Sequence, residues 1–99
     1  MGFIFEVVDK TGRKIRLTKE QWTHVTSPAS PHAYMTNHLE KVKETLINLD
    51  KIISSIYNIR KSNYYKYYKE KRRFLRTIVS YLNGEGFVIT SYFVRNIVR

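Results

Sequence analysis

The pattern of apolar and polar positions at the start of the chain predicts a β-hairpin. Residues 2–9 form an apolar run rich in strand formers, and apolar and basic side chains alternate in residues 13–17. The residues that join the two runs end in Gly12 and are typical of a turn. Two strand-like runs around a glycine-containing turn indicate a hairpin.

Two helices are predicted to follow. Thr18 and Gln21 have the spacing of a capping box, in which the hydroxyl accepts from the Gln21 amide and the glutamine side chain reaches back. This short helix would bury Trp22 and Val25 and end near residues 27–28. The second helix would run from about 31 to 47, because a proline suits its first position. Its apolar side chains recur at helical spacing: Met35, Leu39, Val42 and Leu46.

The rest of the chain is rich in isoleucine, valine and aromatic residues, which favours strands. Residues 63–68 are also compatible with a helix, and residues 84–86 are typical of a tight turn. The fold is therefore predicted to be α+β, with an N-terminal β-hairpin, two helices and then a four-stranded antiparallel sheet. The four strands are expected at residues 52–59, 64–68, 74–82 and 87–94.

Length and composition limit the class of protein. The 99 residues fit one domain, expected to span 1–99, and the apolar share of 42 % is that of a globular chain. The chain has no cysteine, which excludes disulfides, thiolate metal sites and cysteine nucleophiles. The sequence has no apolar run near the roughly 18 residues of a membrane span and no signal-peptide pattern. We therefore expect a cytoplasmic protein that does not enter a membrane.

The charge of the chain points to a polyanionic partner. Eighteen Lys and Arg residues against eight Asp and Glu residues give a net charge of +10. RNA is the first expectation for such a partner. An anionic membrane surface, an acidic protein and plain solubility charge are the alternatives.

Basic and aromatic residues are concentrated in residues 60–76. Cations neutralise phosphates and planar rings stack on unpaired bases, so this mixture favours single-stranded or looped RNA. The alternative is a solvated basic edge hairpin with half-buried tyrosines. The predicted nucleic-acid contacts are Arg60, Lys61, Tyr64, Tyr65, Lys69, Arg72 and Arg73.

Three histidines lie in the helical region. Their spacing is not a zinc signature, and we expect no metal site and no cofactor. His24 and His32 could serve as base and acid in RNA cleavage, one taking the ribose 2′-OH proton and the other protonating the leaving 5′-oxygen. His38 lies beside the apolar stripe of the second helix and is assigned to structure.

The last predicted strand places two polar side chains on one face. By the two-residue period, Thr90 and Tyr92 would lie side by side on one face. The other face is predicted to face the core and consists of Phe87, Ile89, Ser91 and Phe93. Arg76 could project toward that face from the neighbouring strand. Thr90 and Tyr92 could contact phosphate, or they could be ordinary strand residues.

The order of these short motifs resembles the phage-associated barnase–EndoU–colicin–RelE-like nuclease domains. The resemblance extends from Leu17 to Tyr92, with alanine at 33 and leucine at 49 where the family has proline. The residues that carry it are Leu17-Thr18-x-x-Gln21-Trp22-x-His24-Val25, His32-x-x-Met35, Leu39-x-x-Val42-x-Glu44-Thr45-Leu46-x-Asn48-x-Asp50-x-Ile52, Tyr64-Tyr65-Lys66 and Phe87-Val88-Ile89-Thr90-Ser91-Tyr92.

This resemblance implies metal-independent RNA cleavage by acid–base chemistry, of the toxin, effector or mobile-element type. In this reading Lys66 and Arg76 would stabilise charge on the transition state. The implied catalytic residues are His24, His32, Lys66, Arg76, Thr90 and Tyr92. Two alternatives remain: a module that binds RNA or DNA without cutting it, and a protein-interaction domain that docks on an acidic partner such as an antitoxin or inhibitor.

Overall fold

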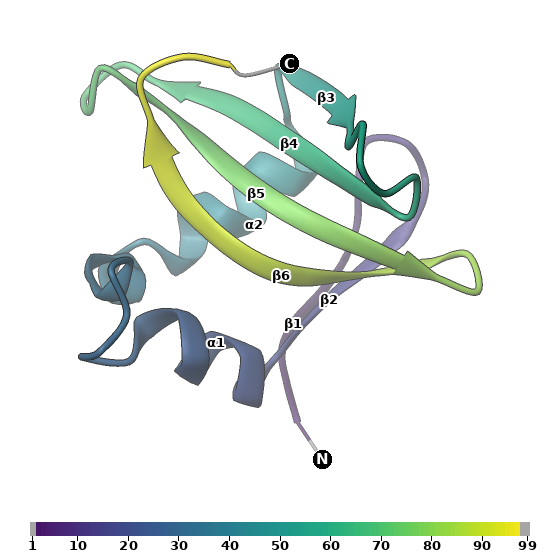
Figure 1. The fold of residues 1–99 in the computed structure, drawn as a ribbon, viewed down its shortest axis with the longest axis horizontal. Helices are drawn as coiled ribbons and strands as arrows, with labels where there is room; N and C mark the ends of the chain where they lie inside the picture. Colours follow the sequence, from purple (N-terminus) through teal and green to yellow (C-terminus); the bar gives the residue numbers. More distant parts are fainter. Residues whose placement is uncertain (1, 98–99) are drawn as a thin grey trace.

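The computed structural model describes residues 2–97 and has an α+β architecture in which two helices and a short 3₁₀ helix lie against one mixed sheet (Figure 1). The predicted N-terminal hairpin and the helix from Thr18 to the region of Pro28 are confirmed. In chain order the elements are β1 (Phe3–Val8), β2 (Lys14–Thr18), α1 (Lys19–Thr26), the 3₁₀ helix η1 (Ala33–Asn37), α2 (Leu39–Ile47), β3 (Lys51–Ser54), β4 (Lys61–Tyr68), β5 (Arg73–Leu82) and β6 (Glu85–Val94).

The predicted four-stranded antiparallel sheet is wrong. The sheet has six strands in the order β1-β2-β6-β5-β4-β3. β3 to β6 do form an antiparallel meander, but β2 adds the hairpin to β6 by parallel pairing, with Ile15 opposite Gly86. A Cβ on Gly86 would collide with the Ile15 side chain and lie 2.8 Å from Val79 Cγ1. The glycine therefore leaves the space in which the hairpin joins the sheet.

The predicted long helix is interrupted. Its apolar stripe is correct, because Met35, Val42 and Leu46 are fully buried. His38 has a non-helical backbone (φ −126°, ψ 23°), however, and it separates η1 from α2. The Met35 carbonyl accepts from the His38 amide, which closes the tighter turn of a 3₁₀ helix. The stripe of apolar positions thus predicted which side chains are buried, but it did not predict the interruption of the helix.

The core lies between the helices and one face of the sheet. α2 passes behind β4, β5 and β6, and α1 lies beside β6 (Figure 1). From the sheet, Ile15, Leu17, Leu75 and Val79 are buried beneath the helices. The opposite face of β4, β5 and β6, called the open face below, has no helix over it in Figure 1.

No helix within residues 2–97 is long and apolar enough to cross a membrane.

Candidate functional site

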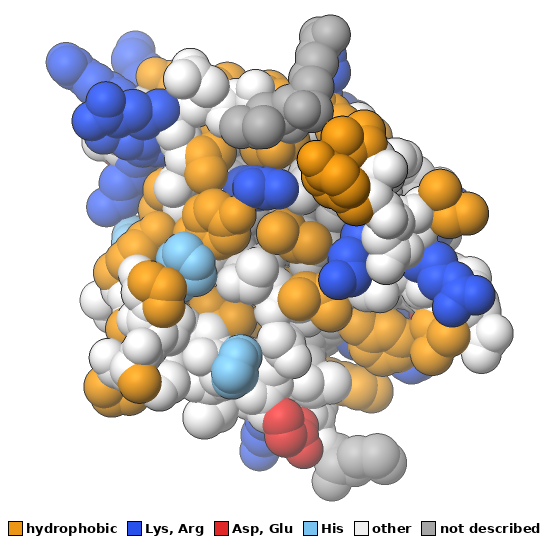
Figure 2. Space-filling view, in the orientation of Figure 1, with side chains coloured by type: hydrophobic (Ala, Val, Ile, Leu, Met, Phe, Trp, Pro, Cys, Tyr) orange, Lys and Arg blue, Asp and Glu red, His pale blue; other side chains and the backbone are white. Residues whose placement is uncertain are grey.

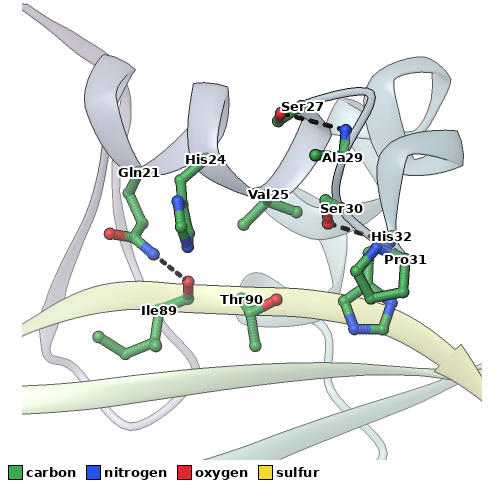
Figure 3. A pocket seen from close by; sticks show the side chains of 10 residues that line it. All are labelled: Gln21, His24, Val25, Ser27, Ala29, Ser30, Pro31, His32, Ile89 and Thr90. Atoms are coloured by element: carbon green, nitrogen blue, oxygen red, sulfur yellow. Dashed lines mark hydrogen bonds between the residues drawn. The ribbon is translucent and has the colours of Figure 1, made fainter.

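A cleft of about 440 Å³ lies between α1, the loop that follows it and β6. It is called the histidine cleft here because two of the three histidines line it. Figure 3 shows both imidazoles directed toward β6, with Thr90 on the strand between them. The lining residues are Gln21, His24, Val25, Ser27, Ala29, Ser30, Pro31, His32, Ile89 and Thr90.

A β-bulge in β6 shapes the floor of the cleft. Ile78 is opposite Thr90 whereas its neighbour Val79 is opposite Val88, so β6 has one extra residue at this point. Bulges bend a strand and redirect its side chains, and they are frequent beside functional sites. The bulge also changes which side chains face inward, because Val88 and Ser91 are buried. The predicted core face of Phe87, Ile89, Ser91 and Phe93 is therefore wrong for its first half.

Gln21 joins α1 to the bulge. The Thr18 hydroxyl accepts from the Gln21 amide at 3.1 Å, as the capping box predicts. The glutamine side chain does not reach back, however, because its Nε2 donates to the Ile89 carbonyl at 2.5 Å (Figure 3). This bond satisfies a backbone group at the bulge and holds the helix that carries His24 against the strand that carries Thr90.

His32 is held by the loop and by an aromatic stack. Its backbone amide donates to Ser30 Oγ at 3.0 Å. Its ring lies parallel to the Tyr92 ring, with the centroids 4.3 Å apart and the planes 8° apart. The Tyr34 hydroxyl, on η1, accepts from the Phe93 amide at 3.1 Å. The imidazole therefore has a defined orientation although its segment is not an α-helix.

Arg76 and Tyr92 meet on the open face, as predicted. Arg76 Nη1 donates to the Tyr92 hydroxyl at 2.7 Å, and Arg76 Nε donates to Asn63 Oδ1 at 3.1 Å. Arg76 does not line the histidine cleft. It lines a second depression, called the Arg76 hollow below. Its hydrogen bond to Tyr92, whose ring stacks on His32, connects it to the histidine cleft.

Lys66 is not part of the site. It is opposite Leu75 in the β4–β5 pairing, and its ammonium lies 5.9 Å from the centroid of the Tyr68 ring. The Tyr68 hydroxyl donates to Glu44 and to the Lys41 carbonyl, both on α2. The structure therefore places Lys66 on the helix side of the sheet, away from the open face and from the two histidines.

The predicted nucleic-acid contacts fall into three groups. Tyr64 and Tyr65 are fully buried, so their rings cannot stack on unpaired bases. Lys69, Arg72 and the half-buried Arg73 lie at the β4–β5 turn. Figure 2 shows Lys and Arg side chains gathered at its upper left, where this turn lies, with histidine side chains below them. Arg60 and Lys61 lie at the other end of β4.

His38, to which the sequence assigned a structural role, does not line the cleft. Its ring packs edge-on against Phe93, with the centroids 5.2 Å apart. Burial, together with the nearby charges of Lys71 and Lys41, lowers the pKa of His38. Within residues 2–97, no group of three or more histidines and carboxylates lies close enough together to hold a metal ion.

Sequence reasoning missed three residues that shape these sites. Gln21 was expected to complete its own helix cap, Ser30 was interpreted only as the start of the second helix, and Asn63 was treated only as part of an ambiguous strand. The Ser30-Pro31 pair is a local turn signal that places Ser30 before His32. The contacts of Gln21 with Ile89 and of Asn63 with Arg76 join distant segments, and no local pattern predicts them.

Comparison of the chain with protein-family models, curated proteins and solved structures finds no match.

Proposed function

We propose that this protein is a small endoribonuclease in which His24 and His32 act as a metal-independent acid–base pair. The observation that carries the proposal is that two imidazoles from separate segments line one cleft, with Thr90 on the strand between them. Histidine is the side chain best suited to take and give protons near neutral pH. The net charge of +10 favours a polyanionic substrate.

The proposed reaction is an attack of the ribose 2′-oxygen on the adjacent phosphorus, with release of the 5′-oxygen. One imidazole takes the proton of a ribose 2′-hydroxyl, whose oxygen attacks the adjacent phosphorus. The bond from phosphorus to the 5′-oxygen breaks, and the other imidazole, in its protonated form, gives that oxygen a proton. The products are a 2′,3′-cyclic phosphate and a free 5′-hydroxyl. Either histidine can fill either role in this scheme.

Neighbouring residues would support the two histidines. The Thr90 hydroxyl, which lines the cleft, would donate a hydrogen bond to a phosphate oxygen, where negative charge increases in the transition state. Tyr92 keeps the His32 ring in one plane, and Arg76 keeps Tyr92 in place by its hydrogen bond. Because a catalytic group must be held in its productive geometry, we expect these two residues to act on the rate through His32.

The basic residues of the β4–β5 turn would attract the substrate. Lys69, Lys71 and Arg72 are exposed, and Arg72 has the left-handed backbone (φ 52°) of a tight turn. Contacts of this type depend on the release of counterions from phosphates, so substrate binding should weaken steeply as salt is raised.

The test is incubation of labelled structured RNA with the purified protein in excess EDTA. Wild type should cut the RNA and leave 2′,3′-cyclic phosphate ends. His24→Ala/His32→Ala should not cut it, and the control His38→Gln should cut in proportion to its folded fraction. Equal cutting by wild type and the double variant would contradict the proposal.

Two other results would identify the alternatives. Intact RNA together with salt-sensitive binding would indicate a module that holds nucleic acid without cutting it. No affinity for RNA or DNA at low salt would indicate a domain that docks on an acidic protein, such as an antitoxin or inhibitor.

A further inference from the structure

We propose that the Arg76 hollow binds an unpaired nucleotide of single-stranded RNA, with the Tyr57 ring stacked on the base. The hollow has a volume of about 200 Å³ and lies between the β3–β4 loop and the open face. Tyr57 lines it, and its polar residues are Ser54, Ser55, Asn63 and Arg76. The inference rests on the proposed function for its substrate class and adds a second point of contact with that substrate.

The first support is an apolar loop that is held in an exposed position. Ile56, Tyr57 and Ile59 are 75 %, 92 % and 91 % exposed. Adjacent exposed apolar side chains mark interaction sites more often than single ones do. A tyrosine ring offers a flat surface on which any base can stack.

Hydrogen bonds within the loop fix its shape. The Tyr57 amide donates to Ser55 Oγ at 3.2 Å, and the Arg60 amide donates to Asn58 Oδ1 at 2.9 Å. The Ser55 amide also donates to the Lys61 carbonyl at 2.9 Å, which closes the base of the loop. A ring presented by an ordered loop loses less conformational freedom when it stacks on a base.

The second support is the charge and polarity of the hollow. Asn63 Nδ2 donates to the Ile53 carbonyl at 3.4 Å while its Oδ1 accepts from Arg76, so the amide and the guanidinium are both oriented. Lys51 is two residues from Ile53 on β3, and Lys61 is two residues from Asn63 on β4. Because side chains two residues apart on a strand point to the same side, both lysines lie on the side of the sheet that holds the hollow. A positively charged hollow beside an exposed ring matches the phosphate and the base of one nucleotide.

The third support is the connection to the histidine cleft. Arg76 lines the hollow and donates to the Tyr92 hydroxyl, and Tyr92 stacks on His32. Figure 2 views the open face, where basic and hydrophobic side chains lie together on the right, toward the β3–β4 loop, and histidines lie on the left. One RNA strand that crosses this face would place a base in the hollow and a phosphate at the cleft.

The experiment measures binding separately from cleavage. A fluorescein-labelled single-stranded RNA of about 12 nucleotides, within the usual range of site sizes, is titrated with the His24→Ala/His32→Ala protein and followed by anisotropy. Adding Tyr57→Ala should weaken binding by about 5- to 150-fold, the effect of losing one stacked base. Tyr57→Trp should retain the affinity. Double-stranded RNA of the same length should show no dependence on Tyr57, because its bases are already stacked.

The matched control is Ile59→Ala, a change in the same loop at a side chain of equal exposure that does not line the hollow. It should leave the affinity unchanged. The proposal is overturned if Tyr57→Ala binds like its parent, if Ile59→Ala loses as much affinity, or if no RNA binds. If wild type cuts RNA but binding does not depend on Tyr57, the proposed nuclease activity is supported and this subsite is refuted. If binding depends on Tyr57 but wild type does not cut RNA, the subsite is supported and the nuclease activity is refuted.

Discussion

The histidine cleft and the β4–β5 hairpin differ in how closeness in the sequence relates to closeness in the folded structure. In the cleft, Thr90 lines the same cavity as His24 and His32 although it is far from both in the chain. In the hairpin, the basic and aromatic residues are adjacent in the chain and are distributed between the core, the open face and the turn. A cluster in the sequence is therefore not a cluster on the surface when it lies on a strand, because neighbouring side chains point to opposite faces.

The largest expected effect contrasts one residue from each region. His32→Ala should lower the rate of RNA cleavage by about 10²- to 10⁴-fold, the usual contribution of a general acid or base. Lys66→Ala should keep a rate near that of wild type, because Lys66 lies on the helix side of the sheet. Single-turnover cleavage of a labelled RNA measures both, and equal losses in the two variants would erase the contrast.

Substitutions of two tyrosines on β4 should likewise have different effects on the stability of the protein. Tyr64 donates to buried Asp9 and shares a hydrogen bond with the Tyr81 hydroxyl at 2.6 Å. Tyr64→Phe should lower the free energy of unfolding by about 1–3 kcal/mol, because it leaves a buried carboxylate short of a partner. Tyr67→Phe, at a side chain that is 45 % exposed, should change it by no more than about 0.5 kcal/mol.

Urea unfolding of the two variants measures this difference. A Tyr64→Phe protein as stable as wild type would mean that the buried hydroxyl does not contribute to stability. It would contradict the expected difference between Tyr64 and Tyr67.

A third change tests how the hairpin holds β6, the strand that carries Thr90. Gly86→Ala should destabilise the protein by about 1–3 kcal/mol, because the added methyl group meets Ile15 and Val79 in a filled space. Gly12→Ala serves as a comparison in which strain comes from backbone conformation (φ 91°) with no atom within 4 Å of the added Cβ. Thermal unfolding checks both, and a Gly86→Ala protein of wild-type stability would argue against the parallel pairing of β2 with β6.

The smallest expected effect is a dependence of stability on pH. Burial alone would raise the pKa of Asp9, but hydrogen bonds from Tyr64, Thr11 and the amides of Arg13 and Thr11 outweigh it and lower the pKa below the ordinary 3.8. The stabilisation is therefore complete above the ordinary value and is lost as the pH falls through the lower value of the folded state. Wild type should lose stability below about pH 4, and Asp9→Asn should lose less over the same interval. Parallel urea midpoints at several pH values measure the difference, and identical slopes would contradict it.

The sequence predicted the local elements better than the arrangement of the sheet. The Thr18 cap, the buried stripe from Met35 to Leu46 and the contact between Arg76 and Tyr92 all follow from short-range periodicity. These features depend on residues within one element or on two strands joined by a tight turn. Local patterns are therefore sufficient to find them.

The remaining features depend on contacts between distant segments. The pairing of Ile15 with Gly86 and the bulge in β6 decide the strand order and the orientation of Thr90, and neither has a local signal. The burial of both Tyr64 and Tyr65 could not be read from their type, because tyrosine suits a half-exposed strand equally well. The exposed ring of Tyr57 went unassigned for the same reason.

The pH dependence of RNA cleavage under single-turnover conditions tests the central claim most directly. If His24 and His32 are an acid–base pair, wild type should give a bell-shaped profile, since one imidazole must be neutral and the other protonated. His24→Ala and His32→Ala should each keep a low residual rate and lose a different limb of that profile. Profiles in which both variants keep the full bell, or lose the same limb, would contradict the account.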